Sequence, residues 1–145
     1  MTGDRTIALE RTFRAPRETV FRCWTEPELL KTWYSPVDEW IVGHAEVTPG
    51  VGGGYLVRFG PAPDGDAYAE EGTYRVFDAP ARLVIEGTVA GEDMQEASLI
   101  EVRFLEEDSG TRVVVTETGL SAEAASEHEQ GWQGCLDHLE ASLAA

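Results

Sequence analysis

The chain has 145 residues, of which 42% are hydrophobic and 26% are charged, values that suit one globular domain with a single core. Its formal net charge of −16 argues against nucleic acid and anionic membranes as partners, because both require clustered Lys and Arg. No apolar run approaches the ~20 residues of a membrane helix, and residues 1–11 lack the pattern of a signal peptide. We therefore expect a cytoplasmic protein without membrane insertion.

The first part of the chain predicts one strand and two short helices. Residues 6–13 alternate between apolar and polar side chains, as in a strand with one buried face. Residues 14–26 predict a helix, because apolar side chains recur at helical spacing after Pro16, which suits a first helical turn. Residues 27–35 predict a second short helix that ends at Pro36.

The middle of the chain reads as a succession of strands separated by turns. The predicted strands cover residues 40–48, 54–60, 68–77, 82–89, 98–106 and 111–119. Glycine-rich residues 49–54 lead into a strand and lack a following Lys-Ser or Lys-Thr, so they indicate a turn or bulge and not a phosphate loop. Residues 127–143 predict an amphipathic helix whose apolar stripe must cover the sheet. This order predicts an α+β fold with an antiparallel sheet of about seven strands.

Five segments in this order resemble one known superfamily. They are residues 11–36, 48–59, 72–87, 108–120 and 127–143. Together they are similar to the START-like superfamily, also called SRPBCC or birch-pollen-allergen-like, in the branch that resembles the activator of heat-shock protein 90 ATPase (Aha-type).

The resemblance implies a single helix-grip domain over residues 1–145. In that fold a curved antiparallel sheet wraps around the C-terminal helix, two short helices follow the first strand, and a cavity lies between sheet and helix. Members of the superfamily bind lipids, sterols, polyketides or other apolar molecules there. Some are cyclases or aromatases, and some assist a chaperone, so the resemblance implies a pocket more firmly than an activity.

Strand alternation and the predicted helix stripe give a set of residues for the pocket. Inward positions on four strands combine with three positions on the last helix, while the strand at 68–77 has an ambiguous parity. The candidate ligand-binding residues are Tyr55, Val57, Phe59, Arg75, Ile85, Val102, Glu117, His128, Trp132 and Leu136.

Glu117 is the most informative of these candidates. A carboxylate that faces an apolar cavity should have a raised pKa or a cationic partner, and Arg75 is the candidate partner. Glu117 and Arg75 would then orient a polar ligand group, or Glu117 would act as an acid or base; the alternative is a salt bridge at a strand end. Gly87 would leave extra room beside it, and Gly131 and Gly134 would thin the helix for a strand or a ligand.

No motif indicates a metal or a cofactor, and we expect neither. His44, His128 and His138 do not have the spacing of a metal triad. Cys23 and Cys135 are expected to be reduced thiols, because no CxxC pair occurs and the compartment is reducing.

Three functional hypotheses remain from the sequence. The first is a domain that binds an apolar or aromatic small molecule. The second is a cyclase-like or aromatase-like enzyme with Glu117 as acid or base, and the third is a protein-interaction module with a chaperone as partner. Base rates alone favour a homodimer.

Overall fold

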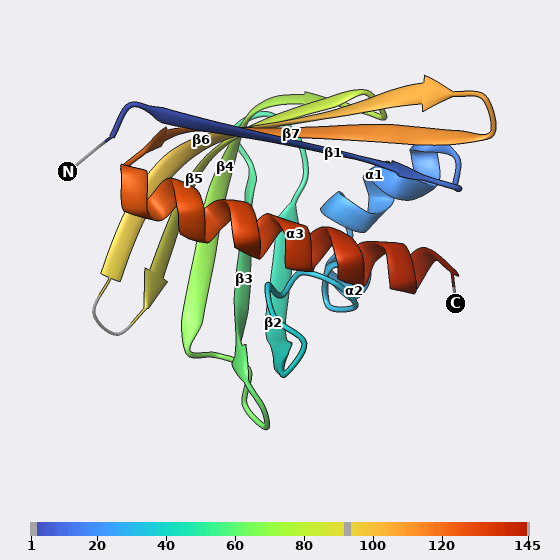
Figure 1. Ribbon diagram of the computed structural model, residues 1–145. Coiled ribbons are helices and arrows are strands. Elements are labelled where there is room, and N and C mark those ends of the chain that lie inside the picture. The colour runs from blue at the N-terminus through green and yellow to red at the C-terminus, as the bar shows by residue number, and fades with distance from the viewer. Residues whose placement is uncertain (1–2, 92–93, 145) are drawn as a thin grey trace.

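The computed structural model describes residues 3–91 and 94–144 of the chain. Within these ranges, seven strands and three helices follow the order predicted from the sequence (Figure 1). Their bounds are β1 Arg5–Phe13, α1 Arg17–Thr25, α2 Pro27–Leu30, β2 Trp40–Thr48, β3 Gly54–Pro61, β4 Tyr68–Asp78, β5 Arg82–Gly91, β6 Met94–Glu107, β7 Gly110–Leu120 and α3 Ala122–Ala144.

The strands form one antiparallel sheet with the order β1-β7-β6-β5-β4-β3-β2. Strands β2 to β7 are a simple meander, whereas β1 joins the far edge by pairing with β7. The sheet curves, and α3 runs across its concave side (Figure 1). This arrangement is the helix-grip fold and confirms the predicted fold class.

The junction between β7 and α3 is set by two local features. Gly119 has a φ of +89°, a backbone conformation that favours glycine, and it is the extra residue where the pairing of β7 with β1 shifts in register. Ser121 then precedes the helix, and its Oγ accepts a hydrogen bond from the backbone N–H of Ala124 at 3.1 Å. The cap fixes where α3 begins and so how its first turns face the sheet.

Aromatic side chains fill the end of the interior beside α1 and α2. The Trp24 ring lies 4.5 Å from that of Trp33 and 5.3 Å from that of Phe104, and Phe21 lies 5.1 Å from Phe104 between centroids. The Trp33 indole N–H also donates to the Cys23 carbonyl at 2.9 Å. These ring contacts fill most of the space at this end, so a large cavity can lie only under the first half of α3.

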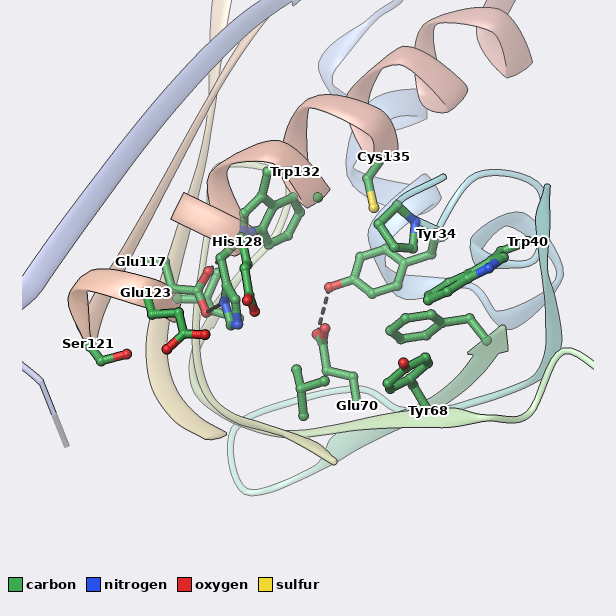
Figure 2. A pocket seen from close by; sticks show the side chains of 16 residues that line it. Tyr34, Trp40, Tyr68, Glu70, Glu117, Ser121, Glu123, His128, Trp132 and Cys135 are labelled. Atoms are coloured by element: carbon green, nitrogen blue, oxygen red, sulfur yellow. Dashed lines mark hydrogen bonds and ion pairs between the residues drawn. The ribbon is translucent and has the colours of Figure 1, made fainter. Parts of the chain in front are cut away.

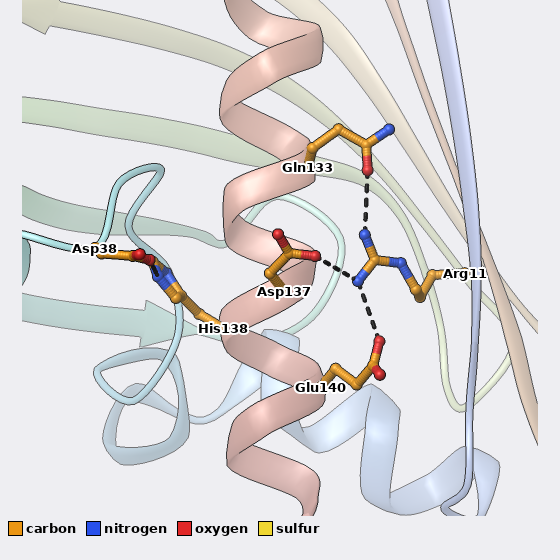
Figure 3. Close-up of polar contacts among 6 residues, drawn as sticks. All are labelled: Arg11, Asp38, Gln133, Asp137, His138 and Glu140. Carbon is orange, nitrogen blue, oxygen red and sulfur yellow. Dashed lines mark hydrogen bonds and ion pairs between the residues drawn. The ribbon is translucent and has the colours of Figure 1, made fainter.

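Helix α3 is fixed on two sides by polar contacts (Figure 3). Arg11 of β1 donates to Asp137 at 2.9 Å, to Gln133 at 3.1 Å and to Glu140 at 3.2 Å. On another side, His138 lies 2.7 Å from Asp38, in the segment between α2 and β2. No helix in the described ranges is long and apolar enough to cross a membrane.

Two local details differ from the sequence prediction. Helix α2 ends at Leu30 and not near residue 35, because the chain tightens into turns in which Trp33 and Tyr34 both donate to the Leu30 carbonyl. In β4, the register with β5 shifts between Tyr74 and Val76, which is a β-bulge. The bulge resolves the ambiguous parity of this strand.

Candidate ligand-binding cavity

A cavity of about 520 Å³ lies between the concave face of the sheet and the first half of α3. Its walls come from the segment after α2, from β2 to β7 and from α3. The lining residues are Tyr34, Pro36, Trp40, Phe59, Tyr68, Glu70, Val89, Ile100, Glu117, Ser121, Glu123, Glu127, His128, Gly131, Trp132 and Cys135.

One wall of the cavity is a stack of aromatic rings from three neighbouring strands. Trp40 of β2 stacks on Tyr68 of β4 with 5.0 Å between centroids, and Phe59 of β3 stacks on Tyr68 at 5.9 Å. Phe59 and Tyr68 are direct cross-strand partners, which explains why their rings face the same side of the sheet. The stack gives the cavity a flat apolar surface that suits an aromatic or aliphatic ligand group.

Glu117 lies on the inner face of β7 and is only 2% exposed. Trp132 donates to its Oε1 at 2.9 Å, while Ser98 at 2.5 Å and His128 at 3.0 Å both contact Oε2. Burial alone would raise the pKa of Glu117. The hydrogen bond and charge of His128, together with the hydrogen bonds from Ser98 and Trp132, lower it by more, so the pKa lies below its usual value. Glu117 is therefore an ionised and well-satisfied carboxylate.

Glu70 is a second buried carboxylate, on the inner face of β4 and 7% exposed. The hydroxyls of Tyr34 at 2.6 Å and Tyr55 at 2.5 Å both donate to its Oε2. Among the residues that the structure describes, none donates to Oε1. Burial is the main cause that raises the pKa of Glu70, and the nearby charge of Glu117 adds to it, although the two phenols oppose the shift.

Gly72 explains how Tyr55 reaches Glu70 from the neighbouring strand. Gly72 pairs directly with Tyr55, and a Cβ placed on Gly72 would lie 2.5 Å from Tyr55 Cε2 and 2.6 Å from Ile85 Cγ2. The Tyr55 ring therefore lies across the bare backbone of Gly72. A side chain at this position would lift the ring and move its hydroxyl away from Glu70.

Figure 2 shows how these groups divide the cavity. Glu117 and His128 lie on one side, Trp40 and Tyr68 lie on the other, and Glu70 projects between them toward the Tyr34 hydroxyl. The site thus combines an apolar wall with a small number of fixed polar groups. Such a combination is typical of cavities that hold small organic molecules.

The family model described as "Activator of Hsp90 ATPase homolog 1-like protein" matches residues 14–144. The chain belongs to this family. The match confirms the Aha-type resemblance seen in the sequence. A search of curated proteins gave no significant match.

Several solved structures superimpose over almost the whole chain. A protein from Rhizobium leguminosarum is 30% identical, with a TM-score of 0.81 and coverage of 99% of this chain and 97% of that one. The AHSA1-like protein of Aeromonas hydrophila is 24% identical, with a TM-score of 0.80 and coverage of 96% and 95%. DynU16, a protein in the dynemicin biosynthetic locus, is 15% identical at a TM-score of 0.78 and matches 99% of this chain with 48% of its own. The last two likenesses show the fold alone.

The structure brings four of the predicted site residues of this Aha-type chain to the cavity wall, namely Phe59, Glu117, His128 and Trp132. Tyr55 and Ile85 line a much smaller adjoining void of about 10 Å³. Val57, Val102 and Leu136 are buried in the packed core and do not line the cavity. The ligand-binding role of these residues stays a prediction.

Arg75 does not reach the cavity, and its predicted pairing with Glu117 is wrong. Arg75 forms an ion pair with Glu86 at 2.7 Å, and both side chains are more than half exposed. The reason is the bulge in β4: Tyr74 pairs with Ile85 and Val76 with Val84, so Arg75 is the extra residue and stays on the outer face. The partner of Glu117 is His128 instead.

Glu70 is the functional candidate that the sequence reasoning missed. The ambiguous parity of β4 hid it, because the bulge makes Tyr74 and Phe77 face the same side, with their rings 5.0 Å apart. The inward position of Glu70 could have been inferred from the neighbouring strand β3. Val57 of the inward set on β3 pairs directly with Glu70, and directly opposed residues in a sheet share one face.

The two glycines of α3 have different surroundings. A Cβ on Gly134 would lie 1.9 Å from the carbonyl oxygen of Pro36, so this glycine accommodates the backbone of the segment between α2 and β2, and not a strand or a ligand as predicted. Gly131 does line the cavity, and a Cβ there would meet only the Pro36 ring, at 3.4 Å.

The thiols are structural. Cys23 and Cys135 are both free and buried in the structure. Cys135 lines the cavity, but burial raises its pKa far above the usual range, which leaves it protonated and a poor nucleophile. No cluster of three or more metal-ligating side chains occurs within the described part of the chain.

Proposed function

We propose that the protein binds a small amphipathic organic molecule between the sheet and the first half of α3. The observation that supports it most is the cavity of about 520 Å³, which is within the roughly 300–1,000 Å³ that small-molecule sites occupy. The aromatic stack of Trp40, Phe59 and Tyr68 would hold the apolar part of the ligand. The likeness in fold to DynU16, a protein in the dynemicin biosynthetic locus, agrees with this role.

The proposal is tested by a thermal-shift screen with aromatic and aliphatic compounds, followed by native mass spectrometry of the hits. A ligand at about 100 times its Kd stabilises the folded state by about 2.7 kcal/mol, which corresponds to a rise of several degrees in Tm. Val89→Phe, which places bulk in the cavity, should remove the shift. Val84→Phe, on the opposite face of β5, is the matched control and should retain it.

Failure of every compound to shift Tm, together with a cavity that is filled by side chains in solution, would contradict the proposal. Loss of binding in both valine variants would also contradict it, because the effect would then not depend on the cavity.

Catalysis in the same cavity is a second candidate function. One observation favours it: the pKa of Glu70 is raised and that of Glu117 is lowered, a divergence that is typical of acid and base pairs. The ionised Glu117 would then be the base and Glu70 the acid. For an enzyme, Glu117→Gln should abolish turnover of a bound compound and leave its Kd nearly unchanged; equal loss of both would refute this role.

The chaperone hypothesis stays a prediction that the cavity does not address. The family description names an activator of the Hsp90 ATPase, which makes the middle domain of such a chaperone the partner to test by pull-down. Retention of the wild-type protein at physiological salt would support this role, and its absence would contradict it.

A further inference from the structure

The ionisable side chains that line the cavity are almost all acidic. Four carboxylates line it, from Glu70, Glu117, Glu123 and Glu127. Among the residues described, no Lys or Arg lines it, and His128 is the one basic side chain. An anionic ligand would therefore meet repulsion at every acidic position, whereas a cationic group would be attracted.

The two buried carboxylates are not equivalent toward a ligand. Glu117 has donors on both oxygens, from Trp132 on Oε1 and from Ser98 and His128 on Oε2. Glu70 receives both of its donors on Oε2, which leaves Oε1 as an acceptor without a partner among the described residues. Glu70 is more than nine-tenths buried and lines the cavity, so a donor that reaches Oε1 from the cavity should bind it strongly.

The geometry around Glu70 is fixed before any ligand arrives. Tyr34 comes from the segment after α2 and Tyr55 from β3, so two separate elements hold the carboxylate in one orientation. Donation from two phenols favours the ionised form of the carboxylate and so opposes the rise in pKa that burial causes. The free Oε1 is thereby held as a directed acceptor beside the aromatic wall.

The aromatic wall suits the same kind of ligand. Trp40, Tyr68 and Phe59 all line the cavity, and aromatic rings attract organic cations as well as apolar groups. The described carboxylates do not converge into a metal site, which makes an organic cation the better fit. From these contacts we propose that the ligand is a hydrophobic amine whose protonated nitrogen donates to Oε1 of Glu70 while its apolar part packs on the aromatic wall.

This inference rests on the proposed function, and one titration series separates the two. The probes are 4-phenylbutylamine, 4-phenylbutan-1-ol and 4-phenylbutanoate, which share one apolar body and differ in the charge of the polar end. Calorimetry at about pH 8 keeps the amine protonated, and about 0.15 M salt screens the acidic surface. We expect the amine to bind at least about tenfold more tightly than the alcohol, and the carboxylate to bind weakest.

Glu70→Gln should reduce the ratio of amine to alcohol affinity to near one. Glu71→Gln is the matched control: it removes the same charge from the next residue of β4, which is exposed on the other face of the sheet, and should keep the ratio. An amine preference that survives Glu70→Gln would overturn the assignment, because attraction to the acidic surface would then explain it.

The three ligands also give a result on the unaltered protein that depends on no variant. Equal affinity of the amine and the alcohol would overturn the amine inference and leave the proposed function standing. Absence of binding for all three would overturn both.

Discussion

Replacement of Gly72 by Ala tests whether a bare backbone at this position is needed for Tyr55 to reach Glu70. The added Cβ would lie 2.5 Å from Tyr55 Cε2, 2.7 Å from Tyr55 Cζ and 2.6 Å from Ile85 Cγ2. Overpacking of this kind costs about 1–3 kcal/mol, and displacement of the Tyr55 hydroxyl from Glu70 adds about 1.5–3 kcal/mol. Ala makes the unfolded chain less flexible than Gly does, and this stabilises the folded state by about 0.4–1 kcal/mol. We expect a net loss of about 1.5–5.5 kcal/mol in the free energy of unfolding.

Urea denaturation followed by fluorescence measures this loss, and Gly87→Ala is the matched control. Gly87 pairs directly with Gly72 on the next strand, but a Cβ there would meet only ordinary contacts, the nearest being Ile100 Cδ1 at 3.4 Å. Gly87→Ala should therefore be neutral or stabilise by less than about 1 kcal/mol. Equal stability of the two variants would refute the account of Tyr55 and Gly72.

The other predictions concern charge and helix packing. Glu117→Gln should lower the free energy of unfolding by about 1–3 kcal/mol at neutral pH. Because hydrogen bonds hold the pKa of Glu117 below the usual value for a glutamate, that difference should vanish as pH falls through the folded pKa. Glu70→Gln should do the opposite: burial raises the pKa of Glu70, so the wild type loses stability as pH rises from 4.5 through the folded pKa, and the variant should unfold at higher urea at about pH 8. Urea titrations across pH check both signs, and parallel profiles would contradict them. Gly134→Ala should lower Tm, because its Cβ would collide with the Pro36 carbonyl, whereas Gly131→Ala should raise it by the usual gain in helix propensity.

Much of the fold follows from side-chain periodicity. Alternation placed every strand to within a few residues of its observed bounds, and the stripe of the last helix identified Trp132 as an inward residue. The inward position of Glu117 also followed from alternation, because β7 pairs with β6 without a register shift and its irregularity, at Gly119, comes after Glu117. Period-based reasoning works where the backbone repeats regularly.

The features that the sequence did not predict depend on a backbone irregularity and on contacts between different elements. A bulge at Arg75 reversed the parity of β4 and hid Glu70, and no local pattern announces a bulge with certainty. The partner of Glu117 comes from α3, eleven residues later, through a turn whose geometry sets the distance. The early end of α2 coincides with turns in which Trp33 and Tyr34 donate to the Leu30 carbonyl, and there the Trp33 ring packs on that of Trp24.

The indole signals of the four tryptophans give the most direct measurement of ligand binding in the cavity. Trp40 and Trp132 line the cavity, whereas Trp33 is 1% exposed and lines neither the cavity nor the adjoining void. In ¹⁵N-correlated NMR spectra, a compound that stabilises the protein should shift the indole signals of Trp40 and Trp132 and leave that of Trp33 in place. Stabilisation without a shift at Trp40 or Trp132 would place the ligand elsewhere and contradict the account.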